Sequence, residues 1–181
     1  MSLSTQKHKK VVLSVREIVL FAMYGTLMYA TKAIMEALPN IHLIGMFIIL
    51  FTVLYRSKAL IPIYIDVFLE GLFGGFTLWW IPYLYIWAIL WGVTMLLPKN
   101  LPDKYAAFIY PVICGLHGFA FGTLFAPAQS LLFGLDFKGM IAWIIAGIPF
   151  DITHGISNTL AGLLVLPLSK LLKNLHRAMQ I

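Results

Sequence analysis

Seven ionisable side chains lie within stretches of the sequence that are otherwise apolar: Lys32, Glu36, Asp66, Glu70, His117, Asp151 and His154. A charged group that faces lipid costs roughly 3 kcal/mol, so such groups usually point into a helix bundle or a water-filled cavity. They are therefore the first candidates for binding a polar ligand or for moving protons.

Two pairs of these residues have helical spacing. Asp66 and Glu70 lie four residues apart, so on a helix they share one face, and the glycines that follow them let a ligand or another helix approach closely. Lys32 and Glu36 have the same spacing near the end of the first apolar stretch. This second pair predicts either an ion pair at the membrane interface or a contact with a ligand.

Polar residues recur at positions 151, 154 and 158 of the last apolar stretch, where Asp151, His154 and Asn158 follow one helical face. One interpretation is a polar contact between helices, with His117 as a partner. The other is that these side chains form the wall of a substrate cavity. We expect the second arrangement to bring them near the loop that holds Asn40 and His42.

Aromatic residues are concentrated between positions 76 and 91. An aromatic belt at the membrane interface accounts for Trp79. Tyr83, Trp87 and Trp91 share a helical face and predict a flat wall for a large, partly apolar ligand. The predicted ligand-binding residues are Lys32, Glu36, Asn40, His42, Glu70, Trp79, Tyr83, Trp87, His117, Asp151, His154 and Asn158.

The elements that must position these residues are membrane helices. The 181 residues are 61% hydrophobic and 11% charged, which excludes an ordinary soluble domain. The apolar blocks predict an all-α integral membrane protein with six transmembrane helices, at about 11–38, 42–55, 59–77, 82–97, 105–127 and 139–169. The connection from Pro127 to Gly139 is expected to be a loop on the outer face. The one cysteine, Cys114, predicts no intrachain disulfide and no cysteine metal cluster.

The basic residues predict the orientation. Eleven of the thirteen lysines and arginines fall in segments that are on one side if both termini are cytoplasmic, and only Lys32 and Lys138 fall toward the outside. This bias accounts for the net charge of +6 without a nucleic-acid partner. We expect one membrane domain over 1–181 in the cell membrane, with a basic cytoplasmic segment at 1–13, the bundle at 14–170 and a cytoplasmic tail at 171–181.

Several segments together resemble a known transporter family. They are the small-residue stripe (Ala22, Thr26 and Ala30), LPNIHLIG, FLEGLFGGFTLWWIPYLYIW and AGIPFDITHGISNTLAG. In this order they resemble the substrate-binding S component of an energy-coupling factor (ECF) transporter, a class of ABC importer for vitamins. The resemblance implies a six-helix bundle whose outward-facing ligand cavity is gated by the loops after helices one, three and five.

The resemblance also implies partners. In the family an Ala-x-x-x-Ala pattern on helix one contacts a coupling transmembrane subunit, and two cytoplasmic ATPases drive toppling of the S component. Here Thr26 stands at the middle position of the pattern. The chain has no GxxxxGK[ST] phosphate loop, so energy is expected to come from these partners. We expect no catalytic residue, cofactor or resident metal.

Cobalamin is the substrate that the resemblance favours, since the chain looks most like the cobalamin-specific branch. Pantothenate, a queuosine precursor and a pyrimidine-type vitamin are the alternatives. Two other functions stay open from the residues alone. One is an intramembrane enzyme that uses Glu70, His117, Asp151 and His154. The other is a small carrier in which Asp66, Glu70 and Asp151 relay protons.

Overall fold

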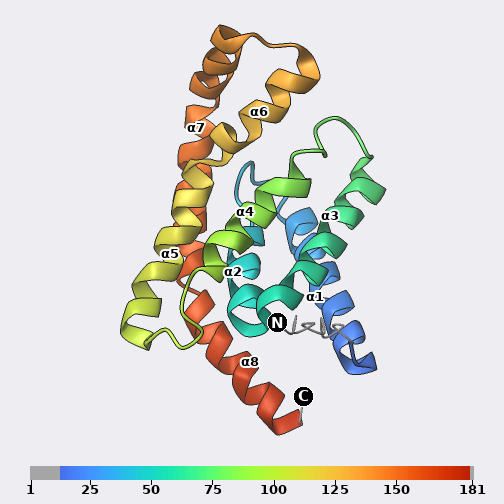
Figure 1. The fold of residues 1–181 in the computed structure, drawn as a ribbon, viewed down its shortest axis with the longest axis vertical. Coiled ribbons are helices and arrows are strands. Elements are labelled where there is room, and N and C mark those ends of the chain that lie inside the picture. Colours follow the sequence, from blue (N-terminus) through green and yellow to red (C-terminus); the bar gives the residue numbers. More distant parts are fainter. Residues whose placement is uncertain (1–12, 180–181) are drawn as a thin grey trace, which may run out of the picture.

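The computed structural model describes residues 13–179, and all the regular structure in this range is helical. The elements are α1 (Val15–Ile34), α2 (Ile44–Tyr55), the 3₁₀ helix η1 (Arg56–Ala59), α3 (Leu60–Gly74), α4 (Tyr83–Met95), α5 (Asp103–Phe119), α6 (Phe121–Phe133), α7 (Phe137–Gly162) and α8 (Val165–Met179) (Figure 1). The expected all-helical class is confirmed for this range. The basic residues Lys7, Lys9 and Lys10 lie outside the described residues.

Three apolar helical stretches are long enough to cross a membrane: Ile44–Gly74, Asp103–Phe133 and Phe137–Gly162. The first is divided at η1, where Arg56 has a φ of 56° and the chain changes direction. The second is divided at Ala120, between α5 and α6. A shorter apolar helix, Tyr83–Met95, accompanies them. These stretches fit the membrane protein that the composition predicts.

Helix α2 lies at the centre of the bundle and is apolar on every side. All nine residues from Ile44 to Thr52 are buried, because α4, α5, α7 and α8 surround it. A helix without a polar face is typical of a protein core or of a membrane span. The loop that precedes α2 is thereby held at the end of the bundle where the cavity described below opens.

Glycines bring α5 and α7 into close contact. A Cβ atom on Gly118 would lie 2.8 Å from the Cα atom of Gly155 on the facing helix. A Cβ on Gly162 would lie 2.6 Å from the Cα of Pro111. Small residues of this kind let membrane helices pack backbone to backbone. The position of α7, and of the polar residues that it carries, is therefore fixed against α5.

The structure corrects two predicted helix boundaries. Pro127 lies inside α6, which continues to Phe133, so the expected loop from 127 to 139 is reduced to a turn at 134–136. The expected last helix, 139–169, is two helices that separate at 163–164. Pro149 likewise lies inside α7. Proline is tolerated in such helices because neighbouring groups compensate for the lost hydrogen bond.

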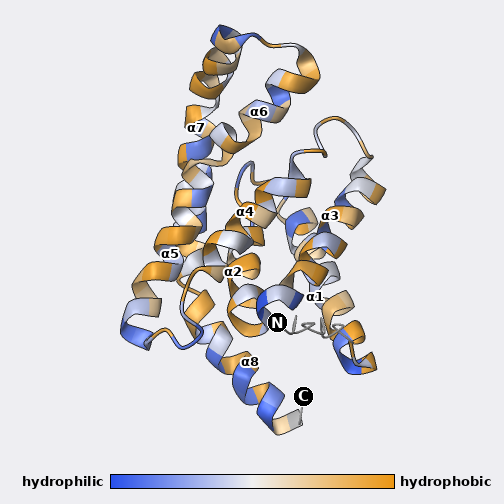
Figure 2. Ribbon diagram, in the orientation of Figure 1, coloured by the Kyte–Doolittle hydropathy of each residue, from blue (hydrophilic) through white to orange (hydrophobic). Residues whose placement is uncertain are grey.

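Basic residues gather at one end of the molecule. The start of α1, η1, the turn between α4 and α5, and helix α8 all lie at this end, and hydrophilic residues mark it in Figure 2. An ion pair joins two of these elements, because the Lys58 Nζ lies 2.5 Å from the Glu17 Oε1. Ser14 and Glu17 also form a capping box at the start of α1. We call this the basic end; the loop between α3 and α4 lies at the opposite end (Figure 1).

Candidate functional site

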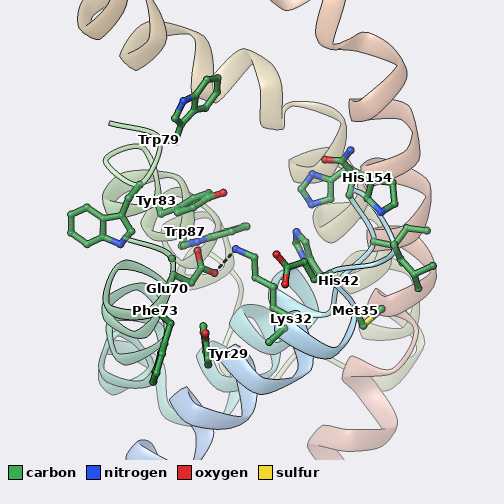
Figure 3. A pocket seen from close by; sticks show the side chains of 18 of the residues that line it. Tyr29, Lys32, Met35, His42, Glu70, Phe73, Trp79, Tyr83, Trp87 and His154 are labelled. Carbon is green, nitrogen blue, oxygen red and sulfur yellow. Dashed lines mark ion pairs between the residues drawn. The ribbon is translucent and has the colours of Figure 1, made fainter. Parts of the chain in front are cut away.

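A cavity of about 480 Å³ lies in the half of the molecule away from the basic end. Its walls come from the end of α1, the loop 35–43, the end of α3, the loop 75–82 and the first turns of α4, with Phe121 and His154 behind them (Figure 3). Nine of the twelve predicted ligand-binding residues line it: Lys32, Glu36, Asn40, His42, Glu70, Trp79, Tyr83, Trp87 and His154.

A charged pair occupies the middle of the cavity wall. The Lys32 Nζ lies 2.5 Å from the Glu70 Oε1, and it also lies over the Tyr83 ring, 4.8 Å from the ring centroid (Figure 3). Lys32 therefore pairs with Glu70 from α3 and not with its helical neighbour Glu36. The pair is a charge contact without hydrogen-bond alignment, and the Glu70 side chain is only 7% exposed.

Asp66 lies one turn before Glu70 on the same helix and is fully buried. Neither carboxylate oxygen has a hydrogen-bond partner among the described residues. The predicted shared face of Asp66 and Glu70 is confirmed, since both face the interior of the bundle. Of the two, only Glu70 reaches the cavity.

An aromatic wall faces the charged pair. The rings of Tyr83 and Trp87 are stacked, with centroids 5.9 Å apart and planes at 14°. Trp80 secures the loop before them by donating from Nε1 to the Val67 carbonyl over 2.7 Å. Trp91, which was expected to continue this wall, instead donates from Nε1 to the Arg56 carbonyl at the basic end. The flat wall therefore consists of Tyr83 and Trp87, with Trp79 at the rim.

Two histidines form the opposite wall. The rings of His42 and His154 meet edge to face, with centroids 4.7 Å apart, and Phe121 contacts His154 from the other side at the same distance. His154 is 2% exposed, and neither ring nitrogen has a hydrogen-bond partner among the described residues. Burial lowers the pKa of His42 well below its usual range, and its Nδ1 accepts a hydrogen bond from the Ile44 amide over 3.4 Å, so the neutral ring has Nε2 left to donate to a ligand.

Three predicted ligand residues lie away from the cavity. His117 is behind Trp87 and contacts the Ile86 carbonyl through Nε2 at 3.2 Å. Asp151 Oδ1 accepts a hydrogen bond from the Gly122 amide over 2.9 Å, which ties α7 to α6. Asn158 is fully buried, and its amide group lies close to Gly45 and Gly118. The structure thus places Asp151 in a polar contact between helices, which was the first of the two interpretations of residues 151, 154 and 158.

Several cavity residues were not predicted from the sequence. Tyr29 and Phe73 stack on each other with centroids 5.2 Å apart, and Phe121 reaches the cavity from the start of α6. Met35 and Thr77 also line the cavity. Aromatic and apolar residues do not stand out in a chain that is mostly apolar, so no local signal marked them.

The small-residue stripe lies on the surface of α1. Ala22 and Thr26 are exposed and Ala30 is half-buried, whereas Gly25 faces inward and packs against Ile65 of α3. The Thr26 hydroxyl donates to the Ala22 carbonyl over 2.9 Å, so it is turned back onto its own helix. The stripe is therefore not used for packing inside the bundle.

Within residues 13–179, no three His, Cys, Asp or Glu side chains lie close enough together to hold a metal ion. No known protein family, curated protein or solved structure matches this chain.

Proposed function

We propose that this chain is the S component of an ECF-type importer, a six-span membrane subunit that captures a vitamin from outside the cell. The observation that carries the proposal is the cavity, which combines a charged pair, a stacked aromatic wall and a buried histidine, His154, that has no hydrogen-bond partner among the described residues. Leaving the two ring nitrogens of His154 without partners costs free energy. A ligand with hydrogen-bonding groups would supply those partners.

The distribution of basic residues supports the proposed orientation. Short cytoplasmic segments carry an excess of lysine and arginine, so the basic end is assigned to the cytoplasm. The cavity lies in the other half of the molecule and would open to the outside. With this orientation both termini are cytoplasmic.

The partners of the proposal are a coupling transmembrane subunit and two cytoplasmic ATPases. The exposed stripe of Ala22, Thr26 and Ala30 supports the first of these, because small residues on a lipid-facing surface let another helix approach closely. The chain carries no phosphate-binding loop of its own.

Cobalamin is the first substrate to test. The cavity volume of about 480 Å³ is in the range of small-molecule sites. It would enclose a vitamin-sized molecule completely, or one edge of a corrinoid whose remainder extends past the loops 35–43 and 75–82. Pantothenate, a queuosine precursor and a pyrimidine-type vitamin are therefore tested beside it.

The experiment measures binding of these four ligands to the purified full chain in detergent, by isothermal titration and by mass spectrometry of retained ligand. Tyr83→Leu removes one member of the aromatic wall and should weaken binding of the true substrate about tenfold, since stacked aromatic contacts contribute roughly 0.5–1.5 kcal/mol beyond their area. Tyr105→Leu, at an exposed tyrosine on α5 that does not line the cavity, is the matched control. The proposal fails if none of the four ligands binds, or if both variants bind equally well.

A proton-coupled carrier is the second candidate, and Asp66 is the observation that favours it. A fully buried carboxyl next to a charged pair, without a hydrogen-bond partner in the described range 13–179, is a group that could take up and release a proton. Proton-driven flux through liposomes that contain this chain alone would support this function, provided that Asp66→Asn abolishes it.

A further inference from the structure

A second pocket, of about 250 Å³, lies at the basic end, far from the cavity. It is formed where the turn between α4 and α5 meets the first turns of α8. One wall is apolar and comes from Val53, Leu101 and Leu166. The other is polar and carries the groups described next. None of these residues belongs to the proposed vitamin site.

Positive charge dominates this pocket. Lys99, Lys170 and Lys173 line it, and Asp103 is the one acidic residue among its lining side chains. The Lys170 Nζ lies 2.5 Å from the Asp103 Oδ2, so this pair is neutral as a whole. Lys99 and Lys173 form no ion pair with any residue between 13 and 179. Two positive charges are therefore left for a ligand.

Neutral donors accompany the lysines. Tyr110 lines the pocket and is 5% exposed, and its accessible hydroxyl makes no hydrogen bond within the described part of the chain. Helix α5 begins in the pocket wall at Asp103, and the first amides of a helix have no partner within it and carry positive partial charge. This combination of a tyrosine hydroxyl, helix amides and ammonium groups suits a phosphate.

The pocket is held open by contacts outside it. Arg56 donates to the carbonyls of Met95 and Leu97, over 2.6 Å and 3.2 Å, and thereby fixes the turn that leads to Lys99. Trp91 secures the Arg56 backbone in turn, by donating to its carbonyl over 3.1 Å. A lysine on a fixed turn loses less conformational freedom when it binds an anion.

We propose that this pocket binds a phosphate group, presented either by the headgroup of an anionic phospholipid or by a soluble phosphate compound. Basic pockets between membrane helices are known to hold lipid headgroups. The apolar wall beside the lysines would contact the glycerol backbone or the first methylenes of such a lipid.

The test uses the purified full chain in a neutral detergent, with short-chain phosphatidylglycerol, short-chain phosphatidylcholine and inorganic phosphate as probes. Native mass spectrometry measures the bound fraction. The Lys99→Gln and Lys173→Gln double variant should weaken binding of phosphatidylglycerol on the order of tenfold. Tyr110→Phe should weaken it severalfold, because it removes one hydrogen-bond donor and keeps the ring.

Lys104→Gln is the matched control, since Lys104 is exposed at the same end but does not line the pocket. All the exchanged lysines are exposed, and thermal melts check that each variant is folded. Binding of phosphatidylglycerol alone assigns the site to lipid, and equal, lysine-dependent binding of inorganic phosphate assigns it to a soluble compound. Equal loss in the Lys104 variant, full retention in the double variant, or equal binding of phosphatidylcholine would each overturn the proposal.

Discussion

The Lys32–Glu70 pair allows a double-mutant cycle that tests whether the cavity wall is a coupled charge pair. Lys32→Met removes the cation but keeps the length of the side chain. The Glu70 side chain, which is 7% exposed, then has no charged partner in the pair. Removing one partner of a fully buried pair costs about 3–5 kcal/mol. Lys32 is 29% exposed, so we expect a smaller cost in this protein, about 2 kcal/mol.

Glu70→Gln should cost less, about 1 kcal/mol, because Lys32 keeps its contact with the Tyr83 ring and can reach water. The variant with both changes leaves no unpaired charge. Its stability should lie within about 1 kcal/mol of the original protein, since replacing a whole buried pair is often nearly neutral. The two single effects would then exceed the double effect by roughly 2 kcal/mol.

Thermal unfolding in detergent, followed by tryptophan fluorescence at one fixed heating rate, measures this cycle. For a chain of this length 1 kcal/mol corresponds to a shift of about 2–4 °C in Tm. Lys32→Met should therefore lower Tm by about 4–8 °C, and adding Glu70→Gln should restore most of that loss. Strictly additive effects would mean that the two side chains act independently, and the coupled pair would be refuted.

Three further predictions concern other parts of the fold. Ala22→Trp should leave Tm and ligand binding unchanged but prevent co-purification with the coupling subunit. Met23→Trp, at an exposed position beside the stripe, should leave all three unchanged. Gly122→Ala should lower the free energy of unfolding by about 1–3 kcal/mol, because the added Cβ would overlap the Asp151 carboxylate that accepts from the Gly122 amide. Gly92→Ala, with open space around it, should be neutral or slightly stabilising. Thermal melts measure both effects. The ring of His176 contacts a tyrosine hydroxyl of α2, and burial lowers its pKa. Because the exposed imidazole of an undocked α8 keeps the usual pKa of about 6.5, protonation below that pH favours the undocked state. The protection factors of the α8 amides, corrected for the pH dependence of intrinsic exchange, should therefore be lower at pH 5.5 than at pH 7.5, and His176→Gln should remove the difference.

Local spacing predicted the cavity only where neighbours in sequence are also neighbours in space. Tyr83 and Trp87 lie one helical turn apart, and their stacking follows from that spacing. The pairing of Lys32 with Glu70 joins two helices whose relative rotation no local pattern fixes. Of the two interpretations of Lys32 and Glu36, the ion pair between them was wrong for this reason, and a ligand contact stays a prediction.

Shared helical faces also predicted more than the cavity could use. Positions 151, 154 and 158 lie on one face of α7, but seven residues span about 10 Å along a helix. Of the three, only His154 is level with the cavity, whereas Asp151 is level with the start of α6. The expected break at Pro127 failed on different grounds, because a breaker in water is tolerated within an apolar bundle.

Three of the ionisable groups at or beside the cavity, Lys32, Asp66 and Glu70, are costly for stability. Apolar residues of similar size at Lys32, Asp66 and Glu70 would avoid the desolvation of charged groups, and such replacements are often stabilising. The rest of the bundle obeys ordinary packing, as the fully apolar α2 and the glycine contacts of α5 with α7 demonstrate. Departures from local rules in an otherwise consistent fold concentrate at functional sites. The cavity is such a departure, since charge, aromatic stacking and an imidazole that no described residue hydrogen-bonds meet there, in the half of the molecule away from the basic end.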